Sequence, residues 1–161
     1  MKRIPLTQGK EARVSDCDYG YLRRWSWYYG QQNGYAMRVS ANRKCILMHR
    51  VVAARKGIIG RTREIDHRNL NKLDNQRHNL RPATTSQNRA YCKRRKNNTS
   101  GFKGVCEEKR WNRWRAYIKI DGKQRHLGTF PKTHAGKIAA ARAYNKAARS
   151  LFKQFAYLNS V

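Results

Sequence analysis

Residues 112–120 alternate strictly between polar and apolar side chains, the pattern of a strand with one buried face. The apolar face carries Trp114, Ala116, Ile118 and Ile120, and the other face carries Arg113, Arg115, Tyr117 and Lys119. Asp121-Gly122 then forms a dipeptide typical of tight hairpin turns, so residues 124–129 are predicted to return as a second strand. Leu127 is expected on the inner face of that strand.

A helix is predicted to follow, opened by Pro131 and Thr133. Its apolar residues recur at helical spacing and are Ala140, Ala143, Tyr144, Ala147 and Leu151. Small alanines let such a helix lie close to a sheet, so this face is predicted to be core.

The first half of the chain is predicted to form short strands, because brief apolar runs alternate there with turn residues. The predicted strands are 4–6, 12–14, 25–29, 35–39 and 45–48. Residues 49–56 are predicted to form a helix. The expected fold class is therefore α+β.

Basic residues greatly outnumber acidic ones, with 37 Lys and Arg against 9 Asp and Glu and a net charge of +28. This imbalance is too large for an ordinary globular enzyme and indicates a polyanionic partner. The hydrophobic content of 39% rules out wholesale disorder. Because no apolar run exceeds four residues and no C-x-x-C pair occurs, we expect neither secretion nor a membrane span, but a reducing cytoplasm.

The charge peaks at residues 93–96, and turn-forming residues follow as far as Gly101. This composition is typical of a linker. The predicted organisation is a region at 1–92, a basic linker at 93–100 and a second domain at 101–161.

A second motif begins at Asp66-His67, where one of the few carboxylates directly precedes a histidine. It continues through Asp74-Asn75, Asn79-Leu80-Arg81 and Gln87-Asn88. This stretch resembles the HNH endonuclease family, in the phage and bacterial homing-type branch.

The resemblance implies a ββα-metal HNH core at about 60–92, with a strand ending at His67, a short strand at 80–83 and a helix starting near Ser86. It implies that His67 is the general base of phosphodiester hydrolysis. Asp66 and Asn88 would bind one Mg²⁺ or Mn²⁺ ion per active site. Asn79 would hold the loop and help to orient the His67 ring.

Taken singly, these residues have ordinary explanations, because an Asp-His pair often lies on a surface and asparagines often occupy turns and helix caps. Their joint spacing favours the nuclease motif. Leu70 stands where relatives commonly have glycine. His49 also matches a family position, where packing or a phosphate contact is expected rather than catalysis.

Residues 100–159 resemble the APETALA-type DNA-binding domain of plant ethylene-response factors. The resemblance is carried by SGFKGV, WRAYIKIDGK, HLGTF, AAARAYNKAA and FAYLN. It implies a three-stranded antiparallel sheet in the DNA major groove, backed by one helix. The expected DNA contacts are Lys103, Trp111, Arg113, Arg115, Lys119, Gln124 and His126, with Arg94 and Arg95 from the linker. Cys106, Glu107 and Glu108 replace arginines of the plant relatives.

The sequence therefore predicts a site-selective, metal-dependent endonuclease that hydrolyses duplex DNA in a bacterial host cytoplasm. Two alternatives stay open at this point. The chain could be a DNA-binding regulator with a vestigial HNH motif, or a nuclease acting on structured RNA. The target sequence, the number of strands cut and the oligomeric state are not predicted.

Overall fold

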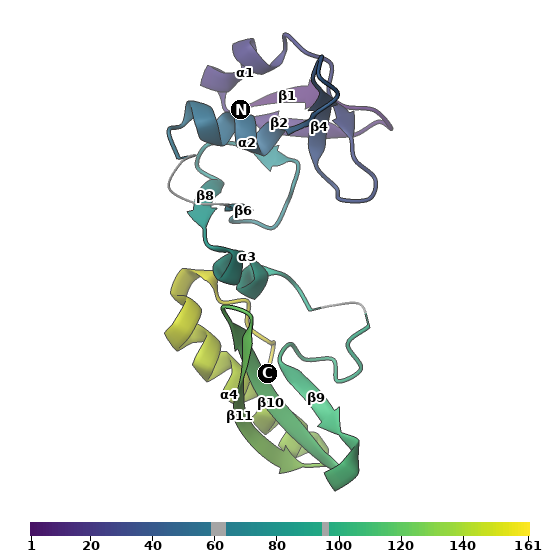
Figure 1. The fold of residues 1–161 in the computed structure, drawn as a ribbon, viewed down its shortest axis with the longest axis vertical. Helices are drawn as coiled ribbons and strands as arrows, with labels where there is room; N and C mark the ends of the chain where they lie inside the picture. The colour runs from purple at the N-terminus through teal and green to yellow at the C-terminus, as the bar shows by residue number, and fades with distance from the viewer. Residues whose placement is uncertain (59–63, 95–96) are drawn as a thin grey trace. The chain divides into compact units, whose positions relative to one another are not determined.

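The computed structural model describes residues 1–58, 64–94 and 97–161 and divides into two compact units, residues 1–84 and 85–161. Both units combine helices and small sheets, so the α+β class is confirmed (Figure 1). The division falls earlier than the linker at 93–100, because the helix that follows Thr84 belongs to the second unit.

The first unit is built from short strands that pair into three small sheets in its described residues. The first sheet holds β1 (Lys2–Pro5), β2 (Glu11–Val14) and β7 (Asp74–Asn75), with β2 and β7 parallel. The second sheet holds β3 (Tyr28–Tyr29), β4 (Ala36–Val39) and β5 (Cys45–Leu47), all antiparallel. The third is the antiparallel hairpin of β6 (Glu64–His67) and β8 (Leu80–Ala83).

Two helices, α1 (Asp16–Leu22) and α2 (Met48–Arg55), accompany these sheets. The structure confirms a strand near each of the five predicted positions and a helix at α2. The prediction for 25–29 is too long, because only Tyr28–Tyr29 is a strand and the Trp27 indole is buried, donating to the Leu22 carbonyl oxygen at 2.9 Å. The sequence analysis did not predict α1 or β7.

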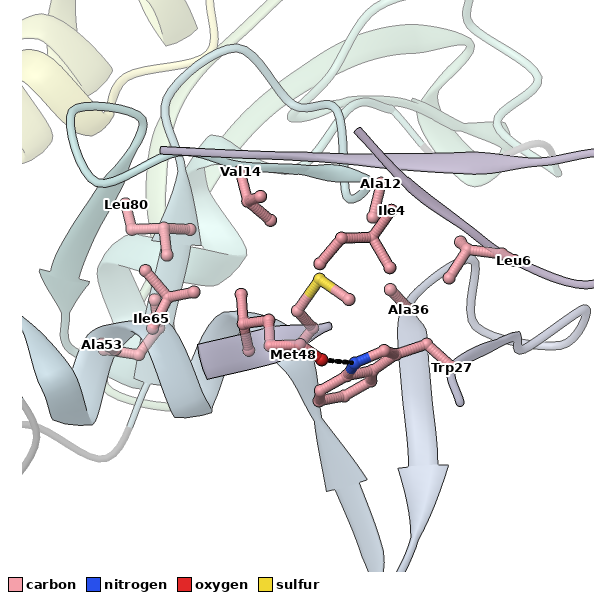
Figure 2. Packing of buried hydrophobic residues seen from close by; sticks show 12 residues of the cluster. Ile4, Leu6, Ala12, Val14, Trp27, Ala36, Met48, Ala53, Ile65 and Leu80 are labelled. Atoms are coloured by element: carbon pink, nitrogen blue, oxygen red, sulfur yellow. Dashed lines mark hydrogen bonds between the residues drawn. The ribbon is translucent and has the colours of Figure 1, made fainter. Parts of the chain in front are cut away.

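The core of the first unit gathers apolar side chains from all three sheets and from α2 (Figure 2). Its labelled members are Ile4, Leu6, Ala12, Val14, Trp27, Ala36, Met48, Ala53, Ile65 and Leu80. Met48, Val14 and Leu80 are fully buried. This shared core fixes the β6–β8 hairpin relative to β7, because Ile65 and Leu80 of the hairpin pack with residues of β2 and α2.

The second unit contains a three-stranded antiparallel sheet in the order β11-β10-β9. The strands are β9 (Val105–Glu108), β10 (Arg113–Ile120) and β11 (Lys123–Pro131), and the turn η1 (Lys109–Trp111) joins the first two. Asp121 and Gly122 form a two-residue turn, and both have positive φ angles, at 48° and 82°. The strict alternation in β10 is confirmed, because Trp114, Ala116 and Ile118 are buried.

Helix α4 (His134–Phe152) covers the inner face of this sheet, and the turn η2 (Lys153–Phe155) and helix α3 (Thr85–Tyr91) complete the unit. Thr133 is the N-cap of α4, since its hydroxyl accepts a hydrogen bond from the Gly136 amide at 3.0 Å. The prediction that Leu151 faces the core is wrong. Leu151 is exposed and Phe152 is buried, because the buried face continues from Tyr144 and Ala148 in steps of four.

Gly104 allows α4 to approach the sheet closely. Its φ angle is 72°, and a Cβ atom there would lie 2.0 Å from the Tyr144 ring and 2.6 Å from the Tyr117 carbonyl oxygen. A larger residue would therefore separate the helix from the sheet. Among the described residues, no helix is both long enough and apolar enough to cross a membrane.

Candidate active site

The β6–β8 hairpin carries the Asp-His pair at the end of its first strand. Asp66 lies opposite Arg81 and His67 lies opposite Leu80 in the strand register. The Asp66 Oδ2 atom is 2.7 Å from Arg81 Nε, and both side chains are only 5% exposed. Adjacent strand residues point to opposite faces, so this ion pair and the His67 ring lie on different sides of β6.

The His67 ring is buried in a cluster of aromatic and amide side chains. Its centroid is 5.2 Å from that of His49 and 6.0 Å from that of Tyr35. Its Nε2 atom is 3.3 Å from the Asn75 amide oxygen. Burial lowers the pKa of His67 below its ordinary value, although the Asn75 hydrogen bond and the Asp66 charge oppose this shift. The imidazole is therefore neutral at neutral pH.

The loop between β6 and β8 is closed by the side chain of Asn79. Its amide oxygen accepts from the Asn69 backbone at 3.0 Å, and its amide nitrogen donates to Asn69 Oδ1 at 3.0 Å and to the Asp74 carbonyl oxygen at 2.7 Å. Asn79, the last residue of the loop, is therefore tied to the start of the loop at Asn69 and to its middle at Asp74. The side chain within hydrogen-bond distance of His67 Nε2 is Asn75, which sequence reasoning did not select although it noted the Asp74-Asn75 pair.

Leu70, in the same loop, has a φ angle of 60°. This left-handed conformation is unfavourable for a residue with a Cβ atom and is readily adopted by glycine. The sequence observation that relatives commonly have glycine here thus has a direct conformational reason.

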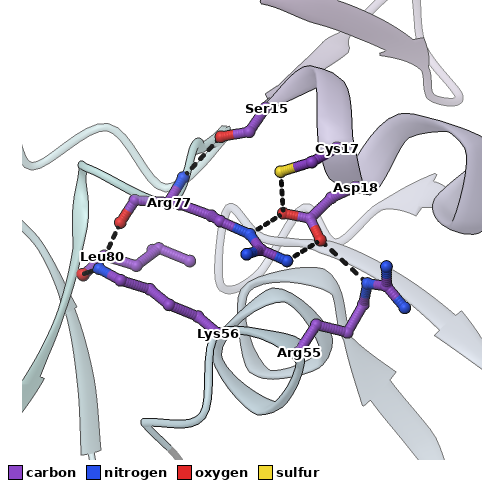
Figure 3. A network of polar contacts seen from close by, with 7 residues as sticks. All are labelled: Ser15, Cys17, Asp18, Arg55, Lys56, Arg77 and Leu80. Atoms are coloured by element: carbon purple, nitrogen blue, oxygen red, sulfur yellow. Dashed lines mark hydrogen bonds and ion pairs between the residues drawn. The ribbon is translucent and has the colours of Figure 1, made fainter.

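A buried carboxylate, Asp18 of α1, fixes the segment that leads into Asn79 (Figure 3). Asp18 is 0% exposed and accepts from Arg77 Nε at 2.7 Å, Arg77 Nη2 at 2.9 Å and Arg55 Nε at 2.9 Å. Lys56 Nζ adds hydrogen bonds to the carbonyl oxygens of Arg77 and Leu80. These contacts tie the loop to α1 and α2, so we call this set the Asp18 clamp.

His49 of α2 is 5% exposed and packs against Tyr35, with ring centroids 4.8 Å apart. Burial, together with the smaller effects of the neighbouring His67, Arg50 and Lys72, lowers its pKa to about 3. His49 is therefore neutral across the working pH range and lies against the His67 ring.

Asp66, His67 and Asn79 thus all lie in or beside the β6–β8 hairpin of the first unit, but Asp66 contacts Arg81, His67 contacts Asn75, and Asn79 contacts Asn69 and Asp74. Asn88 lies in α3 of the second unit, half-buried, and its carbonyl oxygen accepts a hydrogen bond from the Cys92 thiol. Within the residues that the structure describes, no group of three or more His, Cys, Asp or Glu is placed to hold a metal ion.

In the second unit, the polar face of β10 and its neighbours carries most of the residues predicted to contact DNA. The strand register places Lys119 beside Gln124 and Tyr117 beside His126. A shallow hollow on this face is lined by Glu108, Trp111, Arg113, Arg115, His126 and Thr129. Arg113 is exposed and Trp111 is 63% exposed, whereas Arg115 lies 3.8 Å from the Glu108 carboxylate.

Lys103 has a different environment from the other predicted DNA contacts. Its ammonium donates to the carbonyl oxygens of Ala90 and Cys92 at the end of α3. Burial lowers its pKa to about 8. A phosphate would have to compete with these carbonyl groups. Arg94 is exposed, and Arg95 lies outside the described residues.

The chain is similar to a protein of Acanthamoeba polyphaga mimivirus that is named as an uncharacterized HNH endonuclease. The two are 28% identical over 156 residues, which cover 96% of this chain and 77% of the viral protein. No protein-family model and no solved structure matches the chain. The similarity to the viral protein supports an HNH-type nuclease at the level of the family, in agreement with the resemblance of residues 66–88. The APETALA-type resemblance of the C-terminal half stays a prediction.

Proposed function

We propose that this protein is a site-selective, metal-dependent endonuclease of the HNH homing type that hydrolyses phosphodiester bonds in duplex DNA. The observation that carries the proposal is the buried Asp66-His67 pair, in which Arg81 pairs with Asp66 and Asn75 contacts His67, in a chain of net charge +28. The similarity to a viral protein named as an HNH endonuclease supports it along nearly the whole chain.

His67 is proposed as the general base. A base must be unprotonated before it accepts a proton from the attacking water, and the lowered pKa of His67 meets this condition at neutral pH. Asn79 is proposed to keep the loop in place while His67 accepts the proton, because its amide binds Asn69 and Asp74 in the segment that follows His67.

Asp66 and Asn88 are proposed as oxygen ligands of one Mg²⁺ or Mn²⁺ ion. The chemistry of the donors fits, because Mg²⁺ in nucleases and related enzymes is commonly held by one or two carboxylates with water and phosphate oxygens. Arg81 holds one oxygen of Asp66, so the ion would bind through the other oxygen or displace the guanidinium. When bound, the ion would polarise the scissile phosphate and stabilise the leaving oxygen. Asn88 is proposed on the family resemblance alone.

The outward face of the β9–β11 sheet is proposed as the DNA-reading surface. Arg113, Arg115 and Lys119 place three cations on one face of β10, and Gln124 and His126 lie on the same face. Guanidinium groups can donate two hydrogen bonds to one guanine, whereas an ammonium group binds phosphate as a point charge. Trp111 offers an exposed ring that can pack against sugar or base edges. Arg94, Arg95 and Lys103 are proposed as additional phosphate contacts.

The test is cleavage of duplex DNA and of a folded RNA of equal length, each with a Mg²⁺ titration and with excess chelator. We expect cleavage of the DNA that requires Mg²⁺ or Mn²⁺. Binding of DNA without any cleavage would favour a regulator with a vestigial motif. Preferential cleavage of the RNA would favour a structured-RNA nuclease. Undiminished cleavage in chelator would contradict the metal requirement.

A further inference from the structure

The partner of the His67 ring is Asn75, a fully buried residue of β7. Its amide oxygen is 3.3 Å from His67 Nε2. Its amide nitrogen lies 3.3 Å from the Leu73 carbonyl oxygen and 3.6 Å from the Met48 sulfur. Because both of these atoms are acceptors, the NH₂ group must face them. The oxygen of Asn75 is therefore the atom that faces the histidine.

An amide oxygen can only accept a hydrogen bond, so it requires a proton on His67 Nε2. A neutral imidazole carries one proton, which leaves Nδ1 with a free lone pair. Within the described part of the chain, His67 makes no hydrogen bond through Nδ1. The nitrogen that faces Asn75 and the nitrogen that can receive a proton are thus distinct.

We propose that Asn75 is a positioning residue that fixes His67 as the Nε2-protonated tautomer and so makes Nδ1 the proton acceptor. The inference rests on the proposed nuclease function for its catalytic meaning. The tautomer itself follows from the contacts of Asn75, whatever the protein cleaves.

The surroundings keep this arrangement rigid. Asn75 pairs with Val14 in the parallel β2–β7 register, so its backbone belongs to a sheet. The His49 and Tyr35 rings lie close to the His67 ring and restrict its rotation. A 180° turn of the imidazole would place a carbon atom against the Asn75 oxygen and lose the hydrogen bond in a buried site.

The first test measures the tautomer of His67 in the full wild-type chain by long-range ¹H–¹⁵N NMR of its imidazole nitrogens. The signal is assigned as the one missing from His67→Gln. We expect a protonated Nε2 and an unprotonated Nδ1. A protonated Nδ1 in the wild-type protein would overturn the inference, even if the protein cuts DNA as proposed.

The second test uses three variants of the full chain. Asn75→Leu keeps the approximate volume and removes the acceptor, whereas Asn75→Asp keeps an oxygen that can accept from Nε2. Met48→Leu is the matched control, because Met48 contacts the same amide on the side away from His67. We expect a mixture of His67 tautomers only in Asn75→Leu, with the wild-type tautomer retained in the other two.

On DNA, Asn75→Leu should lower kcat by about 10- to 100-fold with KM little changed, a cost of the size measured when metal-binding histidines lose their orienting partner. Asn75→Asp should recover most of that loss. If folded Asn75→Leu retains the wild-type tautomer, Asn75 is only a structural residue and the inference is wrong. If the tautomers behave as expected but no variant, nor the wild type, cleaves nucleic acid, then the proposed function fails and the assignment of Asn75 stands.

Discussion

The two units of this protein keep their shape in different ways. In the second unit, a hairpin with strands of eight and nine residues packs against a helix of 19 residues, and the core is an apolar face on each element. In the first unit, no described strand exceeds four residues, and polar contacts such as the Asp18 clamp hold the loops. Regular elements thus build the predicted DNA-reading face, whereas buried polar contacts build the candidate active site.

The largest expected effect is on chemistry in the first unit. His67→Ala should lower the cleavage rate by about 10²- to 10⁴-fold, because the proposed general base is removed. The matched control is His78→Ala, since His78 is exposed on the loop that also carries Asn79. Rates are measured under single-turnover conditions at saturating DNA. Equal rates for His67→Ala and the wild type would remove His67 from the mechanism.

The next largest effect is on the stability of the first unit. Asp18→Asn leaves the guanidinium groups of Arg55 and Arg77 without a buried carboxylate, which should cost about 3 kcal/mol of unfolding free energy. The control Glu11→Gln breaks an exposed ion pair with Arg3 and should cost less than about 0.5 kcal/mol. Urea unfolding followed by tryptophan fluorescence measures both. Similar costs for the two variants would show that the clamp is no stronger than a surface pair.

The stability difference between the wild type and Asp18→Asn is also expected to depend on pH. Hydrogen bonds from Arg77 and Arg55 hold the pKa of Asp18 below its ordinary value of 3.8, against the opposing effect of burial. The stabilisation is therefore complete above about pH 5 and is lost as the pH falls through the lowered pKa. The stability difference between wild type and Asp18→Asn should shrink below that pH. A difference that is constant down to pH 2 would contradict the role of the Asp18 charge.

A smaller effect is expected at single positions of the DNA-reading face. Arg113→Ala should cost about 1 to 3 kcal/mol of binding free energy at one base position of the target. Lys119→Ala should weaken binding to all sequences alike and flatten the dependence of log affinity on log salt by about 0.9. Competition binding against a library of targets at several salt concentrations separates the two. If both variants weaken binding to all targets alike and change the salt dependence equally, the sheet contacts only phosphates and does not read bases.

The smallest effect is expected at Leu70. Leu70→Gly relieves a left-handed conformation worth about 1 to 2 kcal/mol, but it also adds freedom to the unfolded chain. The net result should be stabilisation by roughly 0.5 kcal/mol, which calorimetry detects as a rise in the Tm of the first unit of about 2 to 4 °C. The control Leu73→Gly, at a residue that packs against the core, should lower Tm.

The sequence predicts the second unit better than the first, because the second unit is defined by signals between residues close in sequence, whereas parts of the first unit depend on contacts between residues far apart in sequence. The alternation of residues 112–120 and the Asp121-Gly122 turn are local signals, and the hairpin they predict is present. Helix α1 and strand β7 have no such local signal. Strand β7 is two residues long and pairs with β2 from about 60 positions away, so only the assembled fold defines it.

The residues of the candidate site also divide into those that a local sequence motif reveals and those that only the folded structure reveals. Asp66, His67 and Asn79 could be selected because their types and spacing form a motif. Asn75 could not, because a buried asparagine looks like a turn residue until its neighbours are placed around it. Asp18 also has no motif, and its role depends on arginines 37 and 59 residues further along the chain.

The central claim is that His67 of the first unit supplies the general base and that the β9–β11 sheet of the second unit reads the DNA. The most direct measurement compares His67→Ala with the double variant Arg113→Ala/Arg115→Ala, recording for each the dissociation constant and the cleavage rate at saturating DNA. We predict that His67→Ala loses the cleavage rate and keeps its affinity, whereas the double variant loses affinity and keeps the rate. Loss of both quantities in each well-folded variant would contradict the division between the two units.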